Sequence, residues 1–377
     1  MSVASVGPSE VRLCGATIVY RLLDVGYAID LAGALDLLAG SAPERVRPLR
    51  GEAQALQIRN PPITVLLGTE ALLIDGRPHT AELSARIFDF GVVSLRVRVA
   101  MPERLSWSEF TRFGRAVDDH AALESMLTQQ LRRLVERIAP AVERPMIADV
   151  REDYTVFRVT RAEYADGTAV RADDLGVLDV VPLLLGESRP LSLEARRELL
   201  PHRFSYYGDD LAVLTWESAL VAEPGEHDTD LQYLLEFANA QLLELRYYDA
   251  ILDAELPRMY DAIEVARRRR SVFPGRRFAG LLSRLQTVVA DTTEVVEQVE
   301  NALKVTDDVY LARVYSAALE IFRGRAWRSG IDRKLGILRD TYAMLNDEAQ
   351  AARSETLEIS IVVLIVAEII MALLRGH

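Results

Sequence analysis

Apolar and polar residues alternate along two neighbouring stretches in the first third of the chain. This alternation predicts one strand over residues 82–87 and a second over 93–99. Asp89-Phe90-Gly91 lies between them and has the composition of a turn. One face of the pair is apolar and the other carries arginines, which predicts an antiparallel sheet with one solvated side.

A helical period follows this hairpin. Ser106-Trp107-Ser108-Glu109 fits a capping box, and an apolar stripe from Phe110 to Ile138 predicts a helix that ends before Pro140. These elements predict an α+β domain over residues 1–225, in one or two subdomains. Its other expected elements are strands at residues 16–20, 63–67, 154–159 and 211–216, and short helices after Asp30 and Ser192.

After Pro224-Gly225 the period changes to heptads. Three apolar seams run over residues 231–266, 282–303 and 331–373, and Asp249 is the polar interruption of the first. Such seams predict long helices packed lengthwise, as a coiled coil or an antiparallel bundle, over residues 226–353. The pattern leaves open whether the packing partners lie in the same chain or in another subunit.

The third seam continues into the most apolar stretch of the chain, residues 357–374. We expect a C-terminal transmembrane helix at residues 354–377, because the apolar side chains outweigh the cost of about 2.5–3.5 kcal/mol for one buried glutamate. A buried helix of a globular domain is the alternative interpretation. The residues of the expected membrane anchor are Leu357, Ile359, Ile361, Val363, Leu364, Ile365, Val366, Glu368, Ile370 and Leu373.

The two ends of the chain add a location and an oligomeric state to this expectation. Residues 1–10 lack the pattern of a secretory signal, so we expect a single C-terminal span in the membrane with the bulk in the cytoplasm. Glu368 falls on the side of the helix opposite to the seam. A glutamate there needs a partner outside the bundle, which favours a homo-oligomer in contact with the lipid bilayer.

Charge narrows the classes of partner. A net charge of −12 argues against a surface that binds nucleic acid as a whole. Nearly all cationic residues are arginines, which is typical of a high-GC bacterial genome, or else indicates selected bidentate contacts to anions. Six arginines surround an expected hairpin tip at Pro274, either as a solvated tip or as a contact for RNA, a ribosome or anionic lipid: Arg267, Arg268, Arg269, Arg270, Arg276 and Arg277.

The residues that usually carry catalysis form no recognisable motif here. The single cysteine, Cys14, excludes an intramolecular disulfide and a multi-cysteine metal site. The five histidines have no pair at ligand spacing, and the chain has neither a glycine-rich nucleotide loop nor a nucleophile elbow. We therefore assign no catalytic residue, no cofactor and no metal.

Some short patterns in the C-terminal third resemble a known family. They are Trp216-Glu217, Leu319-Glu320-Ile321, Leu345-Asn346 and, above all, Ser354-x-x-Leu357-Glu358-Ile359 ahead of an isoleucine-rich stretch and Glu368. This arrangement resembles the RMD/YagE family (required for meiotic nuclear division), whose shared region is a domain of unknown function. The resemblance implies a membrane-anchored, oligomer-forming, non-catalytic protein. Eukaryotic members are linked to the mitochondrial inner membrane and to mitochondrial translation.

Taken together, these patterns predict a membrane-anchored, self-associating scaffold or tethering protein. One alternative is a hydrolase-like enzyme held at the membrane, with its site in the α+β domain. The other is an RNA or ribosome tether that binds through the arginines around Pro274.

Overall fold

The structure is a computed structural model that describes residues 11–41, 44–45, 56–200, 202–225, 229–268, 278–305 and 308–375. Contacts divide the chain into two compact units. The first, called the sheet unit, comprises Met1–Glu244 and Gln298–Arg325. The second, called the helical unit, comprises Leu245–Glu297 and Ala326–His377. The chain passes from one unit to the other within α7 (Asp230–Arg268).

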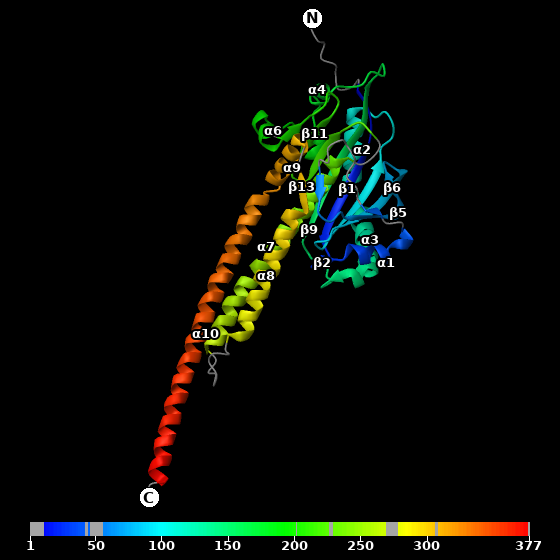
Figure 1. The fold of residues 1–377 in the computed structure, drawn as a ribbon. Coiled ribbons are helices and arrows are strands. Elements are labelled where there is room, and N and C mark those ends of the chain that lie inside the picture. The colour runs from blue at the N-terminus through cyan, green and yellow to red at the C-terminus, as the bar shows by residue number, and fades with distance from the viewer. Residues whose placement is uncertain are drawn as a thin grey trace. The chain divides into compact units, whose positions relative to one another are not determined.

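A nine-stranded sheet forms the centre of the sheet unit (Figure 1). Its strand order is β10-β11-β12-β9-β1-β7-β6-β5-β3. Neighbouring strands are antiparallel except for β12 and β9, which are parallel. The strands are β1 (Val11–Asp24), β3 (Glu44–Arg45), β5 (Ile63–Ile74), β6 (Arg77–Ile87), β7 (Val92–Ala100), β9 (Arg151–Tyr164), β10 (His202–Phe204), β11 (Leu211–Leu214) and β12 (Ser218–Ala222).

The hairpin predicted from the alternation is confirmed. β6 and β7 pair antiparallel, with Ala85 opposite Leu95 and Ser84 opposite Arg96. The turn places Gly91 at φ 95°, a conformation that side chains disfavour, and a Cβ at this position would lie 1.9 Å from the carbonyl oxygen of Gly26. Glycine is therefore required at this turn both for its backbone conformation and for its lack of a side chain.

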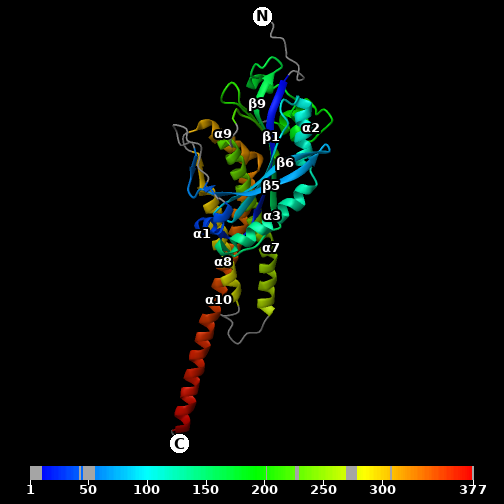
Figure 2. The same ribbon diagram turned by 90° about the vertical axis from the view of Figure 1, so that its right-hand side faces the viewer.

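Helices cover the face of the sheet that carries the larger apolar core. α2 (Trp107–Asp118) and α3 (Ala122–Ile138) run along this face (Figure 2). Their stripes, including Phe110, Phe113 and Leu127, are buried against strand residues such as Val97 and Val99. Ser106 and Glu109 form the predicted capping box. The single helix expected over this stretch is in fact two, because the chain turns at Asp119 while the apolar period stays in phase across the break.

Shorter elements complete the sheet unit. The expected helix after Asp30 is present as α1, whose first turn is capped by the Asp30 carboxylate, and the one after Ser192 is present as α6. Two small ladders pair β2 with β8 and β4 with β13. These elements are α1 (Leu31–Leu37), α4 (Ala172–Leu175), α5 (Val181–Leu184), α6 (Leu193–Leu199), α9 (Val309–Ile321), the 3-10 helices Ala39–Ser41 and Ala139–Ala141, β2 (Ala28–Ile29), β8 (Val142–Glu143), β4 (Leu56–Ile58) and β13 (Leu303–Val305).

The helical unit contains the second part of α7, most of α8 (Ala279–Ala302) and α10 (Gly324–Arg375). The heptad positions predicted to form seams are buried in it, including Leu252 and Met259 of α7 and Ile331, Leu338 and Leu345 of α10. Asp249, the polar residue of the first seam, receives a hydrogen bond of 2.7 Å from the ammonium group of Lys334. The seams of this unit therefore pack against each other within one chain.

The transmembrane helix predicted at residues 354–377 is wrong. In the described part of the chain, no helix combines the length and the apolar character that a membrane crossing requires. The apolar stretch between Glu358 and Arg375 is shorter than the ~20 residues that span a hydrocarbon core, and Glu368 interrupts it. The expected location in a membrane is therefore also wrong.

Candidate functional site

The second face of the sheet, called the polar face, carries four arginines on neighbouring strands. The register places Ser84 of β6 and Tyr20 of β1 opposite Arg96 of β7, and Ala16 of β1 opposite Arg158 of β9. Because side chains alternate along each strand, this register puts a set of arginines on the same side of the sheet. The set is Arg86, Arg96, Arg98 and Arg158.

The first turns of α7 cover part of the polar face. Arg86 forms an ion pair with Glu236, and both side chains are nearly buried. The Arg86 guanidinium also lies 5.0 Å from the ring centre of Tyr233. Burial is the main cause that raises the pKa of the Tyr233 hydroxyl above its usual range. A buried pair of this kind fixes the position of a helix on a sheet, because separating its partners leaves an uncompensated charge.

Arg158 makes a second buried connection between the sheet and α7. Its guanidinium donates to the carbonyl of Gly225 at 2.9 Å and to the side-chain amide oxygen of Gln232 at 3.4 Å. Glu223 lies nearby, and burial raises the pKa of its carboxyl although Thr229 and Arg158 lower it. This part of the polar face is therefore occupied by contacts within the chain.

Another part of the polar face, towards Arg96 and Arg98, is open. It forms a cavity of about 860 Å³, called the sheet-face pocket. The charged residues of its wall are Arg96, Arg98, Arg161, Glu82 and Glu103, and Cys14 lies beside them. A volume in this range accommodates a metabolite-sized molecule.

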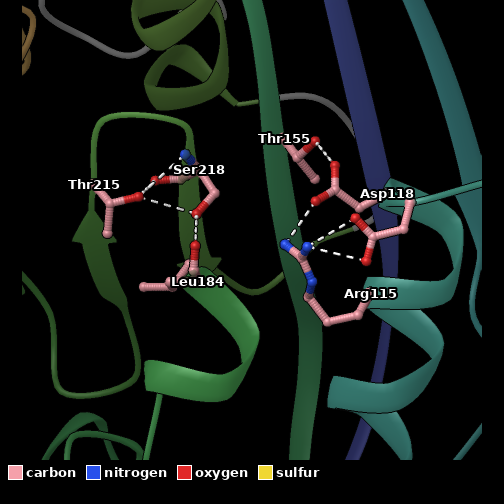
Figure 3. Close-up of polar contacts among 7 residues, drawn as sticks. Arg115, Asp118, Thr155, Leu184, Thr215 and Ser218 are labelled. Carbon is pink, nitrogen blue, oxygen red and sulfur yellow. Dashed lines mark hydrogen bonds and ion pairs between the residues drawn. The ribbon is translucent and has the colours of Figure 1, made fainter. Parts of the chain in front are cut away.

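Two hydroxyl and carboxyl networks lie beside β9 (Figure 3). In the first, the Thr155 hydroxyl donates to the Asp118 carboxylate, which also receives a bond of 2.7 Å from Arg115. Burial raises the pKa of Asp118, while Thr155 and Arg115 act to lower it. Arg115 also binds Asp119, so the network closes the end of α2 against the sheet.

The second network surrounds Ser218 at the start of β12 (Figure 3). The Ser218 hydroxyl donates to the carbonyl of Leu184 at 2.8 Å, and the Thr215 hydroxyl donates to the carbonyl of Ser218 at 2.8 Å. A serine nucleophile must give its proton to a base. Because both hydroxyls donate to backbone carbonyls, this network stabilises a turn and does not resemble a nucleophilic site.

A pair of buried carboxyl groups lies at the C-terminal end of β1. Asp24 and Glu244 of α7 are each about 2% exposed. Asp24 accepts a hydrogen bond of 2.9 Å from the backbone amide of Gly26. Burial raises the pKa of Asp24 to about 7. Burial first, and then the charge of Asp24, raise the pKa of Glu244 far above its usual range.

An exposed apolar surface lies on residues 357–371 of α10, called the distal segment. Side chains on every side of this helix are between 49% and 68% exposed. Contiguous apolar surface of this kind marks an interaction site in folded proteins. Its large apolar residues are Leu357, Ile359, Ile361, Val362, Val363, Leu364, Ile365, Val366, Ile369, Ile370 and Met371.

The residues singled out from the sequence have different placements. The expected anchor residues lie together on the distal segment, apart from Leu373, whose side chain lies outside the described residues. Arg269, Arg270, Arg276 and Arg277 are outside the described residues, as are the side chains of Arg267 and Arg268. Sequence reasoning missed the sheet-face pocket. Its signal was the alternation of Arg96 and Arg98 with apolar residues, which we interpreted as a solvated face.

Comparison with known proteins decides the family. A family model described as "Uncharacterized protein MJ0711, N-terminal domain" matches residues 14–229, which is more than half of the chain. The chain belongs to this MJ0711 N-terminal domain family. It is 26% identical over 227 residues to the uncharacterized protein MJ0711 of Methanocaldococcus jannaschii, a match that covers 59% of this chain and 66% of that relative. No solved structure matches the chain.

The resemblance to the RMD/YagE family was therefore wrong. The family match covers the sheet unit as far as residue 229, and the resemblance rested on residues 216–368. Short patterns of leucine, isoleucine and glutamate recur wherever a heptad seam is apolar. They could not distinguish a family from a helix packing pattern.

Proposed function

We propose that this protein is a self-associating scaffold, in which the distal segment of α10 packs against the distal segment of a second copy. The observation that carries the proposal is the exposure of eleven large apolar side chains on one segment. Burying such side chains contributes about 1.5–3 kcal/mol each, so even a partial contact favours association.

The phase of the heptads argues for a second copy as the occupant. Ile331, Leu335, Leu338 and Leu345 are buried in the helical unit. The same seam continues through the exposed residues Ile359, Val363, Val366 and Ile370. The first half of this seam packs on helices of its own chain. The second half has the same spacing of apolar side chains, so it can pack in the same way against the identical helix of a second copy.

The geometry of an isolated helix gives a second argument. α10 is 52 residues long, and the described chain leaves the eleven large apolar side chains of its residues 357–371 exposed. Helices gain most of their stability in water from packing of an apolar face. A symmetric pair of distal segments provides that packing to both copies at once.

The test compares two matched double variants of the full chain. Val363→Gln with Ile370→Gln changes the seam, and Ile361→Gln with Leu364→Gln changes equally exposed residues on the far face. Light scattering is expected to give a multiple of 42.1 kDa for the unchanged chain and for the far-face variant, and 42.1 kDa for the seam variant. A chain that is monomeric at micromolar concentration before any substitution contradicts the proposal.

A further inference from the structure

The sheet-face pocket combines positive charge with open volume at one place on the sheet unit. Its wall includes residues from five adjacent strands of the sheet, from Leu66 of β5 to Thr160 of β9. The pocket lies beside the part of the polar face that α7 covers. The pocket and the distal segment share no residue, so a ligand site here does not rest on the proposed self-association.

A β-bulge turns an additional arginine into this pocket. On β9, Val159 lies opposite Gly15 and Arg161 lies opposite Cys14, so Thr160 is the extra residue. Without the bulge, Arg161 would point to the face opposite to Arg158, because side chains alternate. With it, both arginines lie on the polar face. Bulges commonly re-aim a side chain next to a functional site.

The bulge depends on Gly15. A Cβ at this position would lie 1.9 Å from the carbonyl oxygen of Arg158, so the two backbones approach more closely than any side chain allows. The Thr160 hydroxyl donates to the carbonyl of Cys14 at 3.2 Å and holds the extra residue in place. The direction of Arg161 is therefore fixed by specific local contacts.

Two of the pocket arginines, Arg98 and Arg161, form partly solvated ion pairs. Arg98 pairs with Glu82 at 2.9 Å, but the Glu82 side chain is 57% exposed. Arg161 lies 3.5 Å from Glu163 and is itself 56% exposed. Ion pairs of this kind contribute about 0.2–1 kcal/mol, so exchanging them for a ligand costs little.

The charge of the wall is opposite in sign to that of the protein. Three arginines and two glutamates give the pocket a net charge of +1, in a chain whose net charge is −12. A concave region of net positive charge favours small anions over cations. Guanidinium groups bind phosphate and carboxylate groups through paired hydrogen bonds.

We propose that the sheet-face pocket binds a small organic anion bearing phosphate or carboxylate groups, held by Arg96, Arg98 and Arg161. The Ser84 side chain lines the same wall and offers a hydroxyl to the ligand. The volume of about 860 Å³ leaves room for an organic body beyond the anionic group.

Cys14 provides a built-in reporter for the test. It is the single cysteine of the chain, it lines the pocket, and its sulfur lies 3.5 Å from the Arg161 guanidinium. The rate at which a maleimide modifies Cys14 in the full chain is measured with increasing pyrophosphate or citrate at constant ionic strength. We expect at least one of the two anions to slow the reaction several-fold in a saturable way. Pyrophosphate alone indicates a phosphate ligand, and citrate alone a carboxylate ligand.

Matched variants separate the pocket from general charge effects. Arg96→Gln with Arg161→Gln is expected to weaken the binding of the protecting anion about tenfold or more, because charge-assisted hydrogen bonds contribute about 1.5–3 kcal/mol. Arg112→Gln, which removes an exposed arginine of α2, is expected to leave protection unchanged. Arg161→Gln alone replaces the double variant if that one does not fold. Absence of protection by both anions, or equal losses in the Arg112 and Arg161 variants, overturns the proposal.

Discussion

Asp24 and Glu244 are two acidic groups that the fold places out of water, and burial favours their neutral forms. The pKa of Asp24 is raised from 3.8 to about 7. Between these two values the folded protein binds more protons than the unfolded chain does. The contribution of Asp24 to the free energy of unfolding therefore falls as the pH rises from about 4 through about 7. This contribution stops changing once the pH is well above the folded-state pKa of Asp24.

Asp24→Asn removes this cost while the amide oxygen still accepts the hydrogen bond from Gly26. We expect the variant to be more stable than the unchanged protein at pH 8, and to lose less stability between pH 5 and pH 8. Urea unfolding at a series of pH values measures this. The control is Asp153→Asn, whose carboxylate is 43% exposed and pairs with arginines. Parallel pH profiles for Asp24→Asn and the unchanged protein would show that Asp24 does not titrate in this range.

Single residues were the least predictable level of the structure. The arginines between residues 93 and 99 were correctly placed on a face opposite to the apolar one, but that face was expected to be solvated. Part of it is covered, because Arg86 pairs with Glu236, which lies 150 positions further along the chain. A periodic pattern shows which side chains share a face and carries no information about a distant partner.

At the scale of helices, Asp249, the polar residue of the first seam, pairs with a lysine of another helix. Lys334 lies between Asp249 and Asp253, with ammonium-to-carboxylate distances of 2.7 and 2.6 Å. Burial lowers the pKa of Lys334, but the hydrogen bonds to the two aspartates outweigh it and raise the pKa overall. Asp249 and Lys334 are each about 14% exposed, so the pair is held away from bulk water.

Lys334→Met should therefore destabilise the helical unit by about 1–3 kcal/mol, because it leaves the Asp249 carboxylate without its main partner. The second substitution Asp249→Leu should recover most of the loss, since it removes the orphaned charge. Thermal unfolding followed by circular dichroism measures both. Asp332→Asn weakens the exposed pair of Asp332 with Arg328 within α10 and should cost less than about 0.5 kcal/mol. Equal losses of stability in the two single variants would show that the Asp249–Lys334 pair contributes no more than an exposed pair.

Helices and strands could be predicted where the period of their apolar residues was long and regular. The heptad seams gave α7, α8 and α10, and the alternation gave β6 and β7. The boundary between α2 and α3 was not predictable, because the stripe keeps its phase through Asp119. The apolar distal segment was wrongly assigned to a membrane, because its apolar run is interrupted by Glu368 and no helix of the described residues has the length and apolar character of a span.

At the scale of the molecule, the order of strands could not be derived from local patterns. β1 lies between β7 and β9, and β9 pairs in parallel with β12, so neighbours in the sheet come from distant parts of the chain. The sheet unit also includes residues 298–325, which follow the second part of α7 and most of α8 in the chain. The family match over residues 14–229 places the shared domain in the half that contains the sheet.

The central claim is that the distal segment of α10 becomes packed by self-association. Hydrogen exchange of the backbone amides of residues 357–371, followed by mass spectrometry at a series of protein concentrations, tests it most directly. Unpacked helices of this length exchange rapidly, and packed ones are protected. We predict that protection rises with protein concentration in the unchanged chain and is lost in Val363→Gln with Ile370→Gln. Protection that is the same at every concentration, or that survives the two seam substitutions, would contradict the account.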